Sequence, residues 1–412
     1  MSNSLTRYAS LLAASVNVQP GQLVVVRCET EYYDLALLAA EAAYQRGASM
    51  VRILTSDPRQ TEQTVRHASE DEIRRMFDTD IDVFNRLADC HGALIGVRGE
   101  QDFNLGSRLQ AEVPDRYQLY MNTLTAAREP YSRLIVNRAQ GQWLVAGAAT
   151  ESWAKQIGIT KDELWERIFR VTFADQENCL ELNAQSDAAL LHRRNILNEL
   201  GYRRFRVTGG GSDFTVGIHP LARWMGGGRV SQRGVPFTPN KPTYENFITP
   251  DWRTANGTLK MHRPFMVEGV PVIGLVVTYK DGEIVEWDAE SGKEAFAQLI
   301  AREGAGRGGE FALADRNTPV YLENMIWWHI LFDENAACHW AFGNGYSAAF
   351  EDGASLTAAE LAERGLAQAK THVDGMWGCD QTCVFGFDAS GTEHPIMLDG
   401  AWAPELANPA GA

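Results

Sequence analysis

Two glycine-rich blocks in the second half of the chain carry residues able to bind a metal ion. The first block holds His339 and Tyr346, and the second holds His372 and Asp374. Imidazole and carboxylate groups are ligands that divalent ions such as zinc take in proteins. Only nine histidines occur in the chain, so two of them beside carboxylate and phenol groups indicate a candidate metal site.

The spacing of these residues, and two further carboxylates, support that interpretation. His372 and Asp374 are two residues apart, which in an extended strand places both side chains on one face, although such a pair alone is equally consistent with a structural role. Glu245 and Glu310 each stand in an otherwise apolar or glycine-rich block. Burial of a carboxylate costs several kcal/mol unless a cation or a hydrogen-bond donor compensates.

Three other motifs favour structural roles. Strand-like residues flank Gly209–Phe214 on both sides and no helix follows it, so a turn between strands is favoured over a phosphate-binding loop. His329 lies in an apolar run, where a histidine is more often a hydrogen-bonded core group than a ligand. Cys379 and Cys383 lack the second close cysteine pair of a structural zinc site, so packing positions are favoured.

The first 200 residues alternate between apolar, strand-like runs and helical patterns. The expected strands cover residues 22–27, 50–54, 91–97, 132–136 and 142–147, and the expected helices cover 33–46, 70–88, 153–157 and 188–200, after an amphipathic helix at the start of the sequence. Alternation of this kind predicts an open, mostly parallel sheet with helices on both faces.

After residue 201 the pattern changes to strands joined by turns. The expected strands cover residues 205–208, 214–218, 258–262, 271–279 and 283–287, and Lys280–Gly282 is typical of a hairpin turn. We therefore predict an α/β N-terminal domain over residues 1–200 and an α+β, metal-bearing catalytic domain over residues 201–412.

The amino-acid composition disfavours nucleic acid and membranes as binding partners. The net charge is −15 and the calculated pI is about 5.1, so the surface repels nucleic acid and anionic membranes. The sequence has no apolar run near the ~20 residues that span a bilayer and no continuous signal-peptide core. Six cysteines, mostly in apolar or site-like segments, favour a reducing cytoplasm.

Six blocks, in this order, resemble the thermophilic-type metallo-aminopeptidase family, which includes aminopeptidases T and S. The resemblance covers nearly the whole chain, through Ala39–Ala48, Gly211–Phe214, the blocks around Glu245 and Glu310, Leu331–His339 and His372–Asp374. No single block is sufficient, but collinear blocks make a specific match.

The resemblance implies a set of site residues and partners. The implied metal ligands are Glu245, Glu310, His339, His372 and Asp374, with Tyr346 as the phenol of the site. The family is known for two-domain subunits and for dimers that enclose the site, so a homodimer acting on peptides with a free N-terminus is expected. This chain departs from the family pattern at Tyr244, Gly375 and Trp377, which leaves the ligands intact but affects the expected pocket for the substrate side chain.

Two imidazoles and three carboxylates suit a pair of divalent ions, zinc, cobalt or manganese, that activate a water for peptide hydrolysis. In this hypothesis Tyr346 donates a hydrogen bond to the developing oxyanion, and Glu310 or Glu245 carries the proton to the leaving amine. Two alternatives stay open. Both histidines and one carboxylate suit an Fe(II) site for ring-cleaving dioxygenation, as in a known relative of this fold, and a non-catalytic metal-dependent binding protein is the other.

Overall fold

In the computed structural model, which describes residues 2–407, the chain forms two units. The first contains the residues up to Asn183 together with Gly228–Pro242, and the second contains Ala184–Gly227 and the residues from Thr243 onward. The chain passes between the units three times, at 183/184, 227/228 and 242/243. The single domain boundary between residues 200 and 201 therefore stays a prediction.

The first unit is built on the expected parallel sheet. Its strand order is β2-β1-β3-β4-β9, with every neighbouring pair parallel. The strands are β1 (Leu23–Glu29), β2 (Met50–Ser56), β3 (Ala93–Arg98), β4 (Gln142–Gly147) and β9 (Asn240–Lys241), and the short pair β7 (Arg229–Val230) and β8 (Pro236–Phe237) forms a separate ribbon. Apolar β-branched runs such as Val24–Val26 are fully buried, as expected for central parallel strands.

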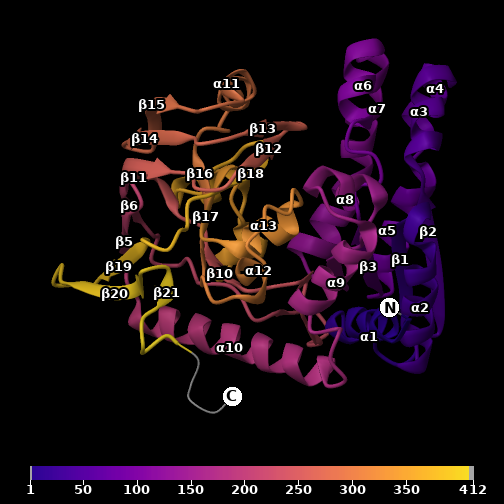
Figure 1. Ribbon diagram of the computed structural model, residues 1–412, viewed down its shortest axis with the longest axis horizontal. Helices are drawn as coiled ribbons and strands as arrows, with labels where there is room; N and C mark the ends of the chain where they lie inside the picture. Colours follow the sequence, from indigo (N-terminus) through magenta and orange to yellow (C-terminus); the bar gives the residue numbers. More distant parts are fainter. Residues whose placement is uncertain (1, 408–412) are drawn as a thin grey trace. The chain divides into compact units, whose positions relative to one another are not determined.

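Helices complete the first unit. In sequence order they are α1 (Ser2–Ser15), α2 (Tyr33–Gln45), α3 (Pro58–His67), α4 (Glu70–Arg75), α5 (Asp78–Asp89), α6 (Leu105–Glu112), α7 (Pro114–Pro130), the π-helix η2 (Tyr131–Asn137), α8 (Glu151–Ile157) and α9 (Lys161–Val171). One face of the sheet packs Val25 and Leu94 against Phe84 of α5 and Ile135 of η2. Figure 1 shows α3, α4, α6 and α7 standing side by side beyond this layer.

Two expectations for this unit are wrong. Residues 132–136 are not a strand, because they form η2, in which the Arg138 amide donates to the Arg133 carbonyl, five residues back, at 3.2 Å. Pro130 has no amide hydrogen to continue the α-helical pattern, and the turn after it widens. The single helix expected over residues 70–88 is broken at Met76 and Phe77 into α4 and α5.

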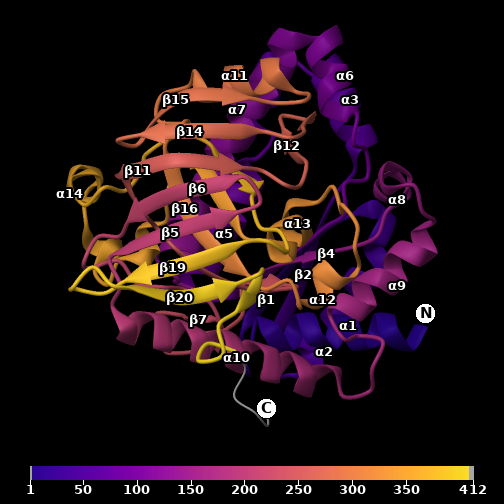
Figure 2. The same cartoon turned by 60° about the vertical axis from the view of Figure 1, so that its left-hand side comes forward.

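The second unit contains two antiparallel sheets. The larger has the order β15-β14-β11-β6-β5-β19-β20-β21, and the smaller has the order β10-β16-β17-β18 (Figure 2). The larger sheet comprises β5 (Arg204–Gly209), β6 (Ser212–Gly217), β11 (Asp251–Lys260), β14 (Val276–Lys280), β15 (Glu283–Asp288), β19 (Cys383–Phe387), β20 (Glu393–Leu398) and β21 (Ala401–Trp402). The smaller comprises β10 (Glu245–Ile248), β16 (Gly308–Ala314), β17 (His339–Gly343) and β18 (His372–Met376).

The turns in this unit follow their residue types. Gly209–Phe214 lies in a β5–β6 hairpin, as predicted, and Lys280–Gly282 joins β14 to β15 with positive φ at both Asp281 and Gly282. The strand expected over residues 271–279 is divided at Gly274 into β13 (Val270–Val272), paired with β12 (Phe265–Val267), and β14. The remaining helices are α10 (Cys179–Leu200), α11 (Lys293–Ile300), α12 (Pro319–Leu322), α13 (Ile330–Ala336) and α14 (Ala358–Glu363). The predicted fold class, a parallel α/β part followed by an α+β part, is confirmed.

An aromatic core joins the two sheets of the second unit. Phe214 of β6 packs edge-to-face on Trp340 of β17 with ring centroids 5.1 Å apart, and Phe205 of β5 meets Phe311 of β16 at 5.9 Å. Because side chains alternate along a strand, β16 and β17 present the residues between these aromatics on their opposite face. Glu310 and His339 are among those residues.

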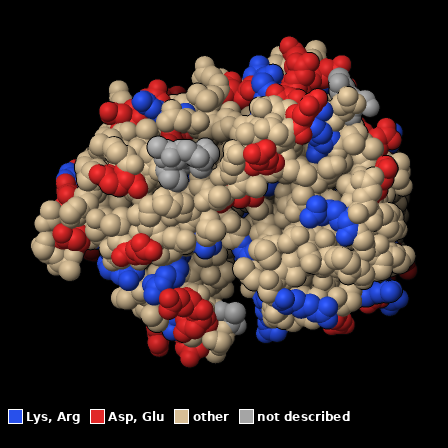
Figure 3. Space-filling model, turned by 90° about the horizontal axis from the view of Figure 1, so that it is seen from below, with Lys and Arg blue, Asp and Glu red and all other residues tan. Residues whose placement is uncertain are grey.

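Charges on the surface are mixed in sign. On the face that Figure 3 presents, acidic and basic side chains are interspersed, and no broad field of basic charge covers it. Across residues 2–407, none of the helices is both long enough and apolar enough to cross a membrane.

Glu29, at the carboxyl end of β1, gives the first testable prediction. Burial, followed by the charge of Glu100, raises the pKa of Glu29 to about 7, although the Gln101 amide donates to its Oε2 at 3.0 Å. Because the pKa of Glu29 is higher in the folded than in the unfolded chain, protonation of Glu29 stabilises the fold. This contribution is complete below the unfolded-state pKa of ~4.4 and is lost as the pH rises through about 7. Glu29→Gln keeps an acceptor oxygen but cannot ionise. We expect its midpoint of thermal unfolding to exceed that of the wild type increasingly between pH 5 and pH 8, and equal slopes for the two proteins would contradict this.

Candidate metal centre

The four-stranded sheet positions the predicted ligands through its register. Glu310 of β16 is paired with Ala341 of β17, which is paired in turn with Asp374 of β18. One register step away, Ala312 of β16 is paired with His339. Small alanine side chains therefore stand beside the longer polar ones, which leaves the polar ends free to converge above the sheet.

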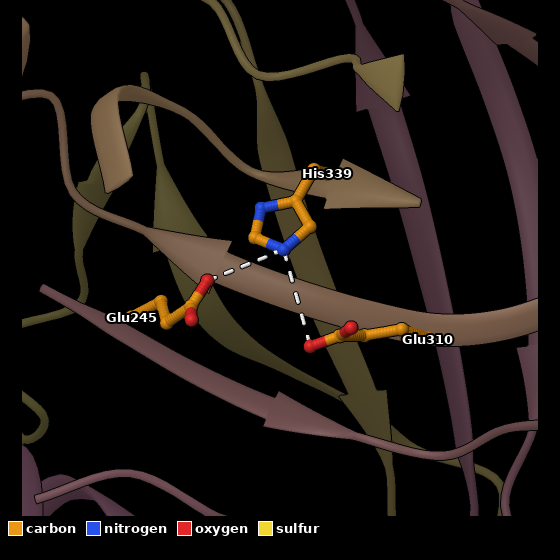
Figure 4. Close-up of side chains that lie close together, drawn as sticks. All are labelled: Glu245, Glu310 and His339. Atoms are coloured by element: carbon orange, nitrogen blue, oxygen red, sulfur yellow. Dashed lines mark ion pairs between the residues drawn. The ribbon is translucent and has the colours of Figure 1, made fainter. Parts of the chain in front are cut away.

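The first group of converging side chains is Glu245, Glu310 and His339 (Figure 4). Each offers one ligand atom, and these atoms lie within 4.8 Å of one another. His339 Nε2 is 3.2 Å from Glu245 Oε2 and 3.9 Å from Glu310 Oε1. The three residues are only 6%, 4% and 1% exposed, in the order Glu245, Glu310, His339, so the group is buried.

The second group is Glu310, His372 and Asp374, and it shares Glu310 with the first. His372 Nε2 is 3.2 Å from both Glu310 Oε2 and Asp374 Oδ1. His372 and Asp374 therefore point to one side of β18, as their spacing suggested. The Tyr346 hydroxyl lies 3.3 Å from the same imidazole nitrogen, so Tyr346 stands at the edge of the second group.

Backbone carbonyl groups fix the orientation of both imidazoles. His339 Nδ1 is 3.1 Å from the Ala337 carbonyl oxygen, and His372 Nδ1 is 2.7 Å from that of Asn344. A carbonyl oxygen can only accept, so each Nδ1 carries a hydrogen and donates it. With Nδ1–H held by a carbonyl, Nε2 is the ring atom left to face the carboxylates, and its lone pair would be available to a bound cation, as in a metal-ligating histidine.

Negative charge exceeds positive charge in this cluster. Burial and then the carboxylates of Glu334 and Glu310 raise the pKa of Glu245 well above its usual range. Burial acts to raise the pKa of Asp374 also, but the adjacent His372 outweighs it and lowers that pKa. For His372 burial acts in the lowering direction, and the Asp374 and Glu310 carboxylates outweigh it, so its pKa is raised well above the usual value. The excess of buried carboxylates therefore favours binding of cations in this cluster.

A divalent cation fits the observed groups. Glu245 Oε2 and Asp374 Oδ1 are buried and accept no hydrogen bond within residues 2–407, which is costly for a carboxylate oxygen unless a cation is bound. Imidazole nitrogen and carboxylate oxygen together are donors that zinc, cobalt and manganese accept. The two overlapping groups offer places for ions on either side of Glu310.

The residues that the sequence placed outside the site are also outside these groups. Among the described residues, the candidate groups contain no cysteine, so neither Cys379 nor Cys383 belongs to them, and both side chains are partly exposed. His329 is 6% exposed and packs edge-to-face on Phe332. Trp377 is stacked on Phe311 in the core. Its departure from the family pattern therefore affects core packing rather than a substrate pocket.

Glu334 was not among the predicted site residues. It lies on α13, and its charge raises the pKa of Glu245 more than the charges of Glu310 and Asp374 do. Burial and these same carboxylates raise the pKa of Glu334 itself. The block Leu331–His339 contains Glu334, but neither its spacing nor its neighbours distinguish it from a helix-surface acid. Only the fold, in which α13 contacts β16 and β18, brings this carboxylate near the cluster, and it lies outside the two groups of ligand atoms.

Comparisons with known proteins agree with this geometry. Residues 1–402 match the family described as thermophilic metalloprotease (M29). The chain is 33% identical over 411 residues to aminopeptidase 2 of Geobacillus stearothermophilus, an alignment covering 98% of each chain. It is 30% identical to aminopeptidase PepS of Streptococcus thermophilus, with 97% of this chain and 98% of the relative covered. The solved structure of wild-type AmpT from Thermus thermophilus superimposes with a TM-score of 0.85 at 27% identity, covering 97% of this chain and 99% of that one.

These relatives confirm the resemblance inferred from the six sequence blocks. None of them is named as an oxygenase, and the Fe(II) dioxygenase alternative is not supported. The family match extends over nearly the whole chain and includes every residue of the buried cluster. The chain belongs to the M29 family of thermophilic metalloproteases.

Proposed function

We propose that this protein removes the N-terminal residue from peptides at a centre holding two divalent metal ions per subunit. The chain is a metallo-aminopeptidase of the M29 family, and its use of divalent metal follows from that membership. The observation that supports two ions is the position of Glu310, which belongs to both groups of three ligand atoms. A carboxylate has two oxygens, and here Oε1 faces His339 while Oε2 faces His372.

Each residue of the cluster has a proposed role. Glu245, Glu310 and His339 would hold one ion, and Glu310, His372 and Asp374 would hold the other. Bound divalent ions polarise a carbonyl and lower the pKa of a water. The surplus of carboxylates, to which Glu334 adds one, favours the positively charged N-terminus of a peptide over an interior peptide bond.

Proton transfer and charge stabilisation fall to side chains of this chain. Tyr346 donates its hydroxyl hydrogen to the oxygen of the scissile carbonyl as negative charge develops on it. Glu310 or Glu245 accepts the proton of the attacking water and delivers it to the leaving amine. In this proposal both oxygens of Glu310 face ion positions, whereas Glu245 faces His339 with Oε2, so the second oxygen of Glu245 is the one left for this transfer.

Several finer expectations keep the status of predictions. The reducing cytoplasm inferred from the cysteines is one of them. The homodimer and the choice among zinc, cobalt and manganese are likewise predictions.

Metal removal tests the proposal directly. We expect chelator-treated protein to lose at least about 10³-fold in kcat/KM for Leu- or Ala-p-nitroanilide, because both the carbonyl polarisation and the activated water are lost. Titration back with zinc, cobalt or manganese should restore activity only as the bound metal approaches two equivalents per subunit. A peptide blocked by N-acetylation serves as the control and should not be cleaved. Full activity after complete chelation, or at one equivalent of metal, would contradict the two-ion centre.

A further inference from the structure

The first unit has a feature that the peptidase chemistry does not use, at the carboxyl ends of β1 and β3. The strand order β2-β1-β3-β4 means that the chain leaves β1 toward one side of the sheet and leaves β3 toward the other. Open α/β sheets bind ligands at such a switch point, outside the carboxyl ends of the strands. The residues at these two strand ends therefore lie where a sheet of this kind binds ligands.

Two arginines lie side by side at this place. Arg27 of β1 is paired with Gly96 of β3, and Arg98 is two residues further along β3, so alternation puts both arginines on one face. Arg98 is itself paired with Gly147 of β4. A Cβ added at Gly96 would have only one neighbouring atom within 4 Å, the Leu144 carbonyl oxygen at 3.3 Å. Apart from that backbone oxygen, no atom lies within 4 Å of the added Cβ, so no side chain occupies the position next to Arg27.

A third arginine and a phenol converge on the same place from α7 and η2. The Tyr131 ring packs against Phe84, with ring centroids 5.5 Å apart. Burial raises the pKa of the Tyr131 phenol, while the charges of Arg98, Arg27 and Arg128 act to lower it, so the three guanidinium groups lie near this side chain. Partial desolvation of the Arg128 guanidinium, and then the charges of Arg98 and Arg27, lower its pKa to about 10. Arg27 also lies over the ring of Phe84, 5.4 Å from its centroid.

These arginines are not neutralised by direct partners. None of the three forms an ion pair or a side-chain hydrogen bond with any of residues 2–407. Acidic side chains act on them only from a distance: Asp80 on Arg27, and Glu29 and Glu100 on Arg98. Glu29 is half protonated near pH 7, since its pKa is raised to about 7. Three like charges are thus held together in a chain whose net charge is −15.

We propose that Arg27, Arg98 and Arg128, with the Tyr131 hydroxyl, form a binding site for a phosphate group, either inorganic phosphate or a phosphomonoester. Three cations that approach from β1, β3 and α7 match a tetrahedral dianion, which accepts hydrogen bonds in several directions. A flat carboxylate takes one guanidinium fork and carries one charge. The phosphate oxygens would lie beside Gly96, where no side chain stands between the arginines.

Isothermal titration calorimetry of the metal-loaded protein at pH 7.5 and constant ionic strength tests the site. Inorganic phosphate and methyl phosphate should each bind, and the tighter of the two identifies the source of the phosphate group. Arg98→Gln should weaken binding at least about 10-fold, the loss expected for one charge-assisted hydrogen bond. Gly96→Val should weaken it similarly by filling the space, with all three arginines retained. Peptidase activity should be unchanged in both variants, which shows that they fold.

The matched control is Arg52→Gln. Arg52 is exposed and lies on β2, paired with Val25, so it is on the same face of the sheet but away from the carboxyl ends. We expect phosphate affinity within about 2-fold of the wild type in this variant, because surface charges at a distance are screened. The proposal would be overturned if the wild type did not bind phosphate, or if it bound acetate as tightly as phosphate. It would also be overturned if phosphate affinity were unchanged in both Arg98→Gln and Gly96→Val. The last result would place phosphate at the metal centre instead.

Discussion

Glu310→Gln is expected to lower kcat/KM for Leu-p-nitroanilide by about 10³-fold or more and to reduce bound metal below two equivalents per subunit. Glu310 is the only residue common to both groups of ligand atoms, and its two oxygens face different imidazoles. The amide that replaces it keeps the size of the side chain but loses the negative charge and one acceptor oxygen. Both ion positions are therefore weakened by one substitution, whereas His339→Ala or Asp374→Asn affects one group first.

The same substitution should have the opposite effect on stability in the absence of metal. Glu310 lies buried beside Glu245 and Asp374, whose charges repel its own. Removing one of three buried carboxylates relieves that repulsion, so chelator-treated Glu310→Gln should unfold at a higher temperature than chelator-treated wild type. With metal present the order should reverse. Glu283→Gln, an exposed acid on β15 of the same unit, is the control and should change neither quantity. A variant that retains two metals and full activity would remove Glu310 from the centre.

The sequence could identify some of the buried carboxylates of this site but not all of them. Isolated acids in apolar blocks, such as Glu245 and Glu310, signal a compensating cation because their burial is costly. That signal depends on residue type and local context, both of which are visible in the sequence. Glu334 lies between Asp333 and Asn335 in a polar segment. A carboxylate in such a segment is expected to be exposed to solvent, so the sequence gives no reason to expect a compensating cation there. Its position near the cluster follows from the direction of α13, which depends on tertiary packing.

Strand register is the second property that the sequence does not contain. The i and i+2 spacing of His372 and Asp374 predicts a shared face, but nothing local predicts that Ala341 separates Asp374 from Glu310. That pairing results from the packing of Trp340 and Phe342 into the aromatic core, since a shift by one residue would expose both rings and bury Ala341. The core therefore sets the geometry of the metal centre on the opposite face of the same strands.

The fold class could be predicted from the sequence, whereas the local structure of some segments could not. Runs such as Val24–Val26 and the Asp281–Gly282 turn are short-range signals with one favoured conformation each. Residues 132–136 have a similar β-branched composition but follow α7 and Pro130, and burial of Ile135 against α5 stabilises them as a π-helix. Composition alone cannot distinguish a buried strand from a buried helical turn of this length.

Tyr346→Phe should lower kcat about 10²- to 10³-fold while leaving KM and metal content unchanged. The ring keeps its neighbours, because Phe247 at 5.7 Å and the His372 imidazole at 4.9 Å between centroids pack on carbon atoms that phenylalanine retains. The backbone is held separately, since the Tyr346 amide donates to Thr249 Oγ1 at 3.1 Å and the Thr249 hydroxyl donates to the Tyr346 carbonyl oxygen at 3.1 Å. Only the hydroxyl hydrogen is lost, so the change isolates its contribution to the transition state.

The pH dependence of the wild type provides an independent check on that role. Desolvation of the hydroxyl end, followed by the charges of Glu310 and Asp374, raises the pKa of Tyr346 well above its usual value. In the metal-free protein the phenol therefore stays protonated and able to donate. Any alkaline decline in wild-type kcat should then persist unchanged in Tyr346→Phe, displaced only to lower absolute rates. Tyr202→Phe, in the same unit but stacked on His394, should behave as wild type. If Tyr346→Phe instead raised KM or released metal with kcat preserved, the hydroxyl would be acting in binding, and its role as the oxyanion donor would be wrong.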